Sequence, residues 1–183
     1  METKPKNFEV YNLKGKAGEE LCSLYLIKEG WIVQTNINQN KAHVVDFTAF
    51  RFKPGTNEIM FADIKSKAAR THYPDTGFNR SQCNTYLELC KKSNSRCLIM
   101  FVDEHAGECY GNFLDVLMLP YVDKSKRPYP LIESSRFDKE IIYFSIESMN
   151  HFFFLDDANV SELKKLSNRC WEYKDEEFVV DGE

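Results

Sequence analysis

The chain lacks the features that place a protein in a membrane or send it out of the cell. It contains no run of about 20 apolar residues, which is the length that a helix needs to cross a bilayer. Its first seven residues do not show the charged and then apolar order of a signal peptide. We therefore expect a cytoplasmic protein with no membrane partner.

The cysteines also lack the spacing of a zinc cluster. The six cysteines, at positions 22, 83, 90, 97, 109 and 170, include no C-x2-C or C-x4-C pair. Because no secretory signal is seen, we interpret all six as reduced thiols that pack as small hydrophobic side chains.

Aromatic residues, by contrast, are plentiful. They make up 14% of the 183 residues and include 14 Phe. A chain of this length buries roughly 70% of the surface that its unfolded form exposes, so a substantial core is available. We expect one domain at residues 1–171, followed by an acidic and flexible tail at residues 172–183.

The charge is unevenly distributed. The net charge of −4 argues against a nucleic-acid partner, but residues 65–96 carry seven Lys or Arg against two acids. Residues 172–183 carry six acids against one Lys. A basic central segment can follow a phosphate backbone, although an ordinary solvated surface would show the same composition, and both interpretations stay open.

Periodicity and turn residues predict a chain that mixes helices and strands. We expect helices at 14–29, 82–92 and 157–171, with Gly30 ending the first and Ser81 capping the second. Strands are expected at 31–34, 44–52, 58–65, 96–102, 109–119 and 141–145, with a further apolar run at 151–155. Residues 54–57 form a turn, and residues 36–41, 66–80 and 120–130 form loops. The predicted fold class is α/β, with a mixed central sheet flanked by helices.

Two of the predicted strands each carry an ionisable group that a core strand does not need. Asp46 lies in Val-Val-Asp-Phe, and Asp63 and Lys65 lie in Ile-Met-Phe-Ala-Asp-Ile-Lys. Residues two apart on a strand point to the same face, so Asp63 and Lys65 point together. If the two strands form a hairpin, Asp46 lies across from them.

Neighbouring carboxylates raise each other's pKa unless a positive charge lies between them. A hard cation with oxygen ligands supplies that charge, and Mg²⁺ in particular is bound by one or two carboxylates, waters and substrate phosphates. Such a metal lowers the pKa of a bound water and stabilises the negative charge that develops in phosphoryl transfer. A lysine beside it can orient the attacking water.

The arrangement resembles the PD-(D/E)xK nuclease superfamily, whose core runs helix, three strands, helix, strand. Gly15-Lys16-Ala17-Gly18-Glu19 is similar to the entry helix of its Holliday-junction-resolvase-like members. The resemblance implies that Glu19, Asp46 and Asp63 hold Mg²⁺ or Mn²⁺ together with the backbone carbonyl of Ile64. It also implies that Lys65 positions the nucleophilic water.

A second motif follows the predicted loop. Gln82-Cys83-Asn84-Thr85-Tyr86 resembles the QxxxY motif of RecB-type members, and the resemblance implies that Gln82 assists near the metal or the scissile phosphate. The match covers residues 13–103, a restriction-endonuclease-like core, and leaves residues 104–171 as additional strands and a helix of open role. Val45 stands where the family motif has Pro, and Glu20 is an alternative to Glu19 as the helix acid.

The loop between the two motifs is a candidate DNA-contacting segment. Cations suit phosphates, and aromatic rings suit stacking with bases. The residues expected to contact nucleic acid are Lys67, Arg70, His72, Tyr73 and Arg80. A plain surface connection remains the alternative for this loop.

The sequence therefore predicts a metal-dependent nuclease that hydrolyses DNA, with an endonuclease favoured over an exonuclease, and a possible homodimer. One alternative is a catalytically inactive protein of the same fold that acts as a nucleic-acid-binding or assembly module. Another is an unrelated α/β interaction protein, which only the acidic net charge favours. The choice between DNA and RNA and the form of the substrate stay open.

Overall fold

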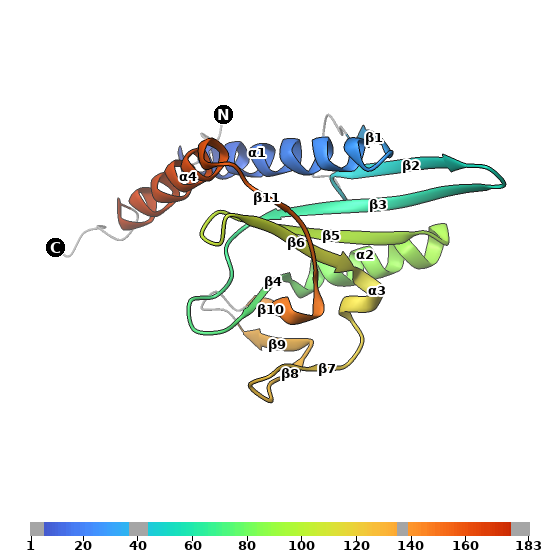
Figure 1. Ribbon diagram of the computed structural model, residues 1–183. Helices are drawn as coiled ribbons and strands as arrows, with labels where there is room; N and C mark the ends of the chain where they lie inside the picture. The colour runs from blue at the N-terminus through green and yellow to red at the C-terminus, as the bar shows by residue number, and fades with distance from the viewer. Residues whose placement is uncertain (1–5, 37–43, 135–138, 177–183) are drawn as a thin grey trace, which may run out of the picture.

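The computed structural model describes residues 6–36, 44–134 and 139–176. Helices and strands alternate along this part of the chain (Figure 1). The helices are α1 (Lys6–Lys28), α2 (Arg80–Ser93), α3 (Leu114–Leu117), the short 3-10 helix η1 (Ile146–Ser148) and α4 (Asp157–Glu176). The strands are β1 (Ile32–Thr35), β2 (Phe47–Lys53), β3 (Thr56–Ser66), β4 (Asp75–Asn79), β5 (Arg96–Asp103), β6 (Glu108–Phe113), β7 (Tyr121–Val122), β8 (Pro128–Tyr129), β9 (Leu131–Ser134), β10 (Glu140–Ser145) and β11 (Asn150–Phe154).

A mixed sheet forms the centre of the described part of the chain, with strand order β1-β2-β3-β5-β6-β11. The β3–β5 pair is parallel, and its neighbours on both sides pair antiparallel. A smaller sheet has the order β4-β10-β9. The predicted fold class, a mixed central sheet flanked by helices, is confirmed, as is the predicted order of helix, three strands, helix and strand, into which β4 is inserted.

The central sheet is covered on both faces. Helices α1 and α4 lie side by side on one face, whereas α2, α3 and the smaller sheet lie on the other (Figure 1). Under α1, Ile64 packs with Cys22 and Leu26. On the opposite face, Tyr86 packs with Phe78 and other aromatic residues. Because side chains alternate along a strand, β3 sends Ile64 towards α1 and its neighbours Asp63 and Lys65 towards α2.

The turn between β2 and β3 sets the register of these residues. Lys53 pairs with Thr56, so Pro54 and Gly55 alone form the turn, and Gly55 has a positive φ of 82° that favours glycine. The register ends at the pair Phe47–Ala62. One residue further, Asp46 lies opposite Asp63, as the sequence predicts.

The ends of the first helix differ in how well they were predicted. Gly30 follows α1 with a φ of 84°, which confirms it as the stop signal. The helix begins at Lys6, eight residues before the predicted start. The predicted start and cap of the second helix are also corrected. Helix α2 begins at Arg80, two residues before its predicted start, and its N-cap residue is Asn79, which makes no side-chain capping bond. Ser81 is therefore inside the helix and is not its cap.

Several elements after residue 66 were predicted wrongly. The loop predicted at 66–80 contains β4, which pairs with β10, and the loop predicted at 120–130 contains β7 and β8. The strand predicted at 109–119 ends at Phe113 and gives way to α3. Leu114 and Leu117 of α3 are buried at helical spacing, and a short apolar run does not distinguish a buried helix from a strand.

The C-terminal helix runs beyond its predicted end. Helix α4 extends to Glu176, so residues 172–176 of the predicted tail have helical backbone. Residues 177–183 lie outside the described residues, and so do the loop residues 37–41.

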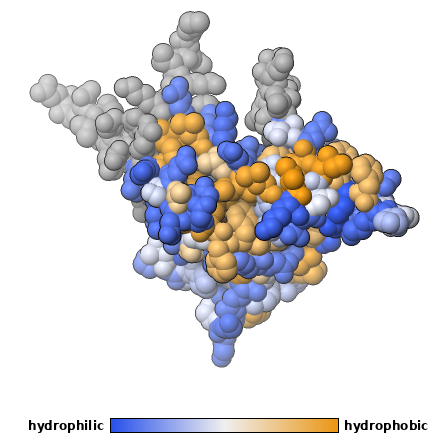
Figure 2. Space-filling model, turned by 45° about the horizontal axis from the view of Figure 1, so that its top comes forward, coloured by the Kyte–Doolittle hydropathy of each residue, from blue (hydrophilic) through white to orange (hydrophobic). Residues whose placement is uncertain are grey.

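The outer side of α1 is partly apolar. Figure 2 shows apolar patches on the face formed by this layer, where Tyr11, Leu13, Leu24 and Ile27 of α1 are exposed. Exposed apolar patches often mark contacts with other molecules, but nothing shows what covers this one, and the homodimer stays a prediction. None of the helices in the described ranges is long and apolar enough to cross a membrane.

Candidate active site at the open end of the β2–β3 hairpin

Asp46 and Asp63 meet where the β2–β3 hairpin opens. Asp46 Oδ2 accepts a hydrogen bond of 2.7 Å from the backbone N–H of Ile64. The carboxyl groups of Asp46 and Asp63 are close enough for each to shift the pKa of the other. Asp63 is 3% exposed, so the two acidic groups share a site that is largely closed to water.

Lys65 and Tyr86 complete this cluster. Lys65 Nζ lies 2.7 Å from Asp63 Oδ2 as an ion pair and donates a hydrogen bond of 3.3 Å to the Tyr86 hydroxyl. Tyr86 in turn donates a hydrogen bond of 2.8 Å to Asp63 Oδ1. The predicted placement of Asp63 and Lys65 on one face is confirmed, and we call Asp46, Asp63, Lys65 and Tyr86 the hairpin cluster.

Burial and mutual repulsion change the protonation of the two acids. Burial, and then the charge of Asp63, raise the pKa of Asp46 to about 7, against the effect of the Ile64 N–H. Burial also raises the pKa of Asp63, which Lys65, Tyr86 and Asp46 oppose. Without a cation, the pair therefore keeps a proton up to about neutral pH.

The donor set of this pair fits a hard divalent cation. Asp63 Oδ2 is buried and, apart from its ion pair with Lys65, accepts no hydrogen bond from the described residues. The N–H and C=O of one strand residue point to the same side, so the Ile64 carbonyl lies on the Asp46 side, where β2 no longer pairs. Two carboxylates and a carbonyl, completed by water and a phosphate, are the ligands that Mg²⁺ prefers.

The third predicted acid, Glu19, is related to the site through the effect of its charge on Asp46. It belongs to α1 and therefore approaches from the opposite face of the sheet to Asp63, yet its charge contributes to the raised pKa of Asp46. No group of three or more His, Cys, Asp or Glu side chains that could hold a metal is found among the described residues. Glu19 as a metal ligand therefore stays a prediction.

Gly18, the residue before Glu19, lies where α1 passes close to the end of β3. A side chain at this position would meet the hydroxyl of Ser66. Glu19 is half-buried, and Glu20, the alternative acid, is exposed. Both line a pocket of about 530 Å³ beside Phe47.

The two residues of the QxxxY motif lie in different surroundings, Tyr86 in the hairpin cluster and Gln82 on the surface. Tyr86 is 2% exposed and belongs to the hairpin cluster, whereas the sequence indicated only a core residue there. Gln82 lies one helical turn earlier on the same side of α2 and is exposed. Its predicted role beside the metal or the phosphate stays a prediction.

The predicted DNA-contacting residues after β3 make several contacts within the protein. Arg70 forms a two-bond ion pair with Asp75, with both distances 2.6 Å, and a further one with Glu133. The Arg70 guanidinium also lies 4.8 Å from the centre of the Tyr73 ring. Arg80 pairs with Glu140 at 2.9 Å.

The other two residues of this set differ. His72 is exposed, as a residue that contacts a ligand from a loop would be. Lys67 donates a hydrogen bond of 2.8 Å to the backbone carbonyl of Gly77. The arginines of the loop are thus occupied by carboxylates, whereas Lys67 is bonded to a neutral group.

Comparison with known proteins gives remote structural likenesses alone. No protein-family model and no curated protein sequence matches this chain. Hjc, a Holliday junction resolvase from Archaeoglobus fulgidus, is 10% identical with a TM-score of 0.43, over 70% of this chain and 87% of that one. D212, a nuclease from a fusselovirus, is 10% identical with a TM-score of 0.45, over 94% of this chain and 98% of that one. At these scores, any functional argument depends on the residues of the site itself.

Proposed function

We propose that this protein is a metal-dependent nuclease of the PD-(D/E)xK type that hydrolyses phosphodiester bonds in DNA. The observation that carries the proposal is the hairpin cluster, in which the buried Asp63 and the half-buried Asp46 lie together beside a lysine ammonium and both have a raised pKa. Buried charges are costly unless they are paired or bind a metal. The pair Asp63–Lys65 accounts for one carboxylate, and Asp46 is left as a second one that a cation would complete.

Asp46, Asp63 and the Ile64 carbonyl would hold the cation, with Glu19 as a further ligand. When bound, Mg²⁺ or Mn²⁺ supplies an activated water and stabilises negative charge on the phosphate. Lys65 orients the attacking water and stabilises its oxygen as the proton leaves. Water adds to phosphorus and gives up its proton to bulk water, the bond from phosphorus to the leaving oxygen of the chain breaks, and that oxygen takes up a proton from bulk water.

Tyr86 acts on this chemistry through its neighbours. Its hydroxyl accepts from Lys65 and donates to Asp63, which fixes the direction of both side chains. The α2 helix that carries Tyr86 also carries the exposed Gln82. A phosphate lying over the cluster would be within reach of this end of α2, where Gln82 would assist.

Cleavage of supercoiled and linear DNA tests the proposal. The wild type should cleave with Mg²⁺ or Mn²⁺ and not in chelator, whereas Asp63→Asn should not cleave. Glu162 is a matched control, because it forms the same acid-x-Lys pattern with Lys164 on the exposed side of α4, so Glu162→Gln should cleave as the wild type does. Equal cleavage by Asp63→Asn and the wild type would overturn the proposal.

A second candidate is a nucleic-acid-binding module of the same fold without turnover. The absence of a three-acid metal group within the described residues favours it. A gel shift in chelator, combined with no cleavage of linear, nicked, flapped or four-way DNA at any metal concentration, would support the binding module. The same panel of substrates defines the specificity if cleavage occurs.

A further inference from the structure

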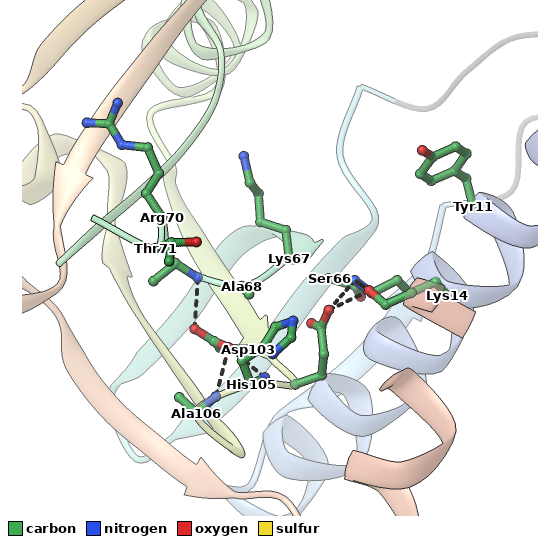
Figure 3. A pocket seen from close by; sticks show the side chains of 13 residues that line it. Tyr11, Lys14, Ser66, Lys67, Ala68, Arg70, Thr71, Asp103, His105 and Ala106 are labelled. Carbon is green, nitrogen blue, oxygen red and sulfur yellow. Dashed lines mark hydrogen bonds and ion pairs between the residues drawn. The ribbon is translucent and has the colours of Figure 1, made fainter. Parts of the chain in front are cut away.

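A pocket lies where β3 leaves the sheet, just beyond Lys65 of the hairpin cluster, and Figure 3 shows the side chains that line it. It is a pocket of about 850 Å³, and its walls come from α1, from the segment after β3, from the turn between β5 and β6 and from α4. Among the residues that line it are Tyr11, Lys14, Lys67, Arg70, Asp103 and Glu104. We call it the Lys67 pocket.

Most charged groups in its wall already have partners within the protein. Lys14 forms an ion pair of 2.7 Å with Glu104, and Arg70 is paired with Asp75 and Glu133 outside the pocket.

Asp103 is held by four hydrogen-bond donors, the backbone N–H groups of Ala69, His105 and Ala106 and the Tyr110 hydroxyl. Both of its oxygens are therefore occupied. Glu104 has its Oε1 bonded to Lys14 and Ser167, whereas its Oε2 is buried and accepts no hydrogen bond from the described residues. Its charge is balanced by Lys14.

Lys67 is the exception in this wall. Its ammonium donates to the Gly77 carbonyl, and it forms no ion pair with a carboxylate of the described residues. Figure 3 shows its side chain extending between Arg70 and Tyr11. Burial, and then the positive charges of Lys65 and Arg70, lower the pKa of Lys67, against the charge of Asp75. Asp75 is itself bonded to Arg70, so a partly buried ammonium without an ion pair of its own is a position that an anion would complete.

The position of Lys67 relative to the hairpin cluster identifies the anion. Lys67 follows Lys65 by two residues, and its backbone N–H donates a hydrogen bond of 3.0 Å to the Lys65 carbonyl, which holds the two residues close together where β3 ends. Ser66 between them lines the pocket, so the pocket begins directly beside the lysine of the hairpin cluster. Its volume lies within the range of about 300–1,000 Å³ that is usual for ligand pockets, and Tyr11 at its rim has the ring on which a base can stack.

We propose that the Lys67 pocket binds a nucleotide of the substrate strand next to the cleaved bond, with Lys67 as the counter-ion of its phosphate. This inference rests on the proposed nuclease function and names the part of the substrate that the site holds beyond the cleaved phosphate. Lys67 contacts the phosphate, and Tyr11 lies where the base or sugar would pack. The ion pairs of Lys14 and Arg70 keep the wall in shape.

Calorimetric titration in chelator tests this binding without any cleavage. The probes are deoxyadenosine 5′-monophosphate, deoxyadenosine and inorganic phosphate. The nucleotide should bind to the wild type more tightly than either of its parts does. Lys67→Gln should weaken nucleotide binding by roughly tenfold or more, because a hydrogen bond to a charged group is lost.

Two further variants make the outcome specific. Lys92 is exposed on α2 and paired with Glu88, so Lys92→Gln should bind the nucleotide as the wild type does. Lys53 is exposed at the closed end of the β2–β3 hairpin and paired with Glu58, so Lys53→Gln should also retain binding. Thermal unfolding of each variant establishes that it is folded.

Equal affinity of Lys67→Gln and the wild type, or no saturable nucleotide binding to the wild type, would overturn this inference. Failure of the proposed function would be seen differently, as a wild type that binds the nucleotide but does not cleave DNA with any metal. The two proposals therefore fail in distinguishable ways.

Discussion

Two buried lysine–carboxylate pairs at the same end of the molecule have nearly the same internal geometry. Lys65 is 2.7 Å from Asp63, and Lys14 is 2.7 Å from Glu104. A hydroxyl bridges each pair, Tyr86 in the first and Ser167 in the second. The bonds alone therefore do not distinguish a candidate catalytic group from a structural one.

The surroundings distinguish them. Lys14, Glu104 and Ser167 join α1, the end of β5 and α4, and their charges balance one to one. The hairpin cluster has one more carboxyl group, that of Asp46, whose pKa burial and Asp63 raise to about 7. An excess buried acid is unfavourable for a purely structural pair and useful for binding a cation. This difference predicts that the two pairs respond differently to the same changes.

The largest effect is expected on stability, at the balanced pair. Lys14→Met should lower the free energy of unfolding by about 3–5 kcal/mol, because it leaves the charge of Glu104 buried without a counter-ion. Denaturant unfolding at pH 7 measures this loss. Lys14→Met with Glu104→Gln should recover much of it, and a single variant as stable as the wild type would show that the pair does not hold α1 in place.

The next effect is expected on reaction rate, at the hairpin cluster. Lys65→Met should lower the rate of DNA cleavage by roughly a hundredfold or more, as is usual when a group that moves or orients a proton is removed. Lys164→Met is the matched control from the exposed acid-x-Lys pattern on α4. If Lys65→Met is less stable but cleaves DNA as fast as the wild type per folded molecule, the hairpin cluster has a structural role only, like the Lys14–Glu104 pair.

The third effect is expected on the pH dependence of stability, and it is tested by removing the acidic group of Asp46. The raised pKa of Asp46 means that the folded protein holds a proton that the unfolded chain releases near pH 4. Without metal, stability should therefore fall as the pH rises from about 4 to about 7. At pH 8 in chelator, Asp46→Asn should be more stable than the wild type by roughly 2 kcal/mol, after allowance for partial exposure of this group.

Adding metal gives a second test of the wild type against Asp46→Asn. Mg²⁺ should raise the unfolding temperature of the wild type at pH 8 and not that of Asp46→Asn, since metal binding requires the deprotonated acid. If the stability of both proteins has the same pH dependence from 4 to 8, Asp46 does not carry the proton assigned to it.

The hairpin cluster could be predicted because its information is local. The Pro54-Gly55 turn and the two-residue period of β3 set the register of Asp46, Asp63 and Lys65 within a span of 20 residues. The start of α2 was placed within two residues, which brought Tyr86 towards the same face. Its hydrogen bond to Asp63 is a matter of side-chain packing that the motif alone did not show.

The rest of the fold depends on contacts between distant segments. Strand β4 lies in a segment whose Pro, Asp and Gly residues predict a loop, and its partner β10 is more than 60 residues away. The pair of Lys14 and Glu104 spans 90 residues. Neither residue stood out in the sequence, because a lysine on a helix and an acid after a strand are ordinary surface residues until the fold brings them together.

The smallest expected effect compares the bridging hydroxyls. Tyr86→Phe should cost about 1 kcal/mol of stability through the lost hydrogen bond. It should also move the pH profile of cleavage upward, since Tyr86 lowers the pKa of Asp63. Tyr110→Phe is a matched control, because Tyr110 donates a similar bond to Asp103. Ser167→Ala should have a similar cost in stability. Identical pH profiles of Tyr86→Phe and Tyr110→Phe would mean that the Tyr86 hydroxyl, like that of Ser167, only supports the fold.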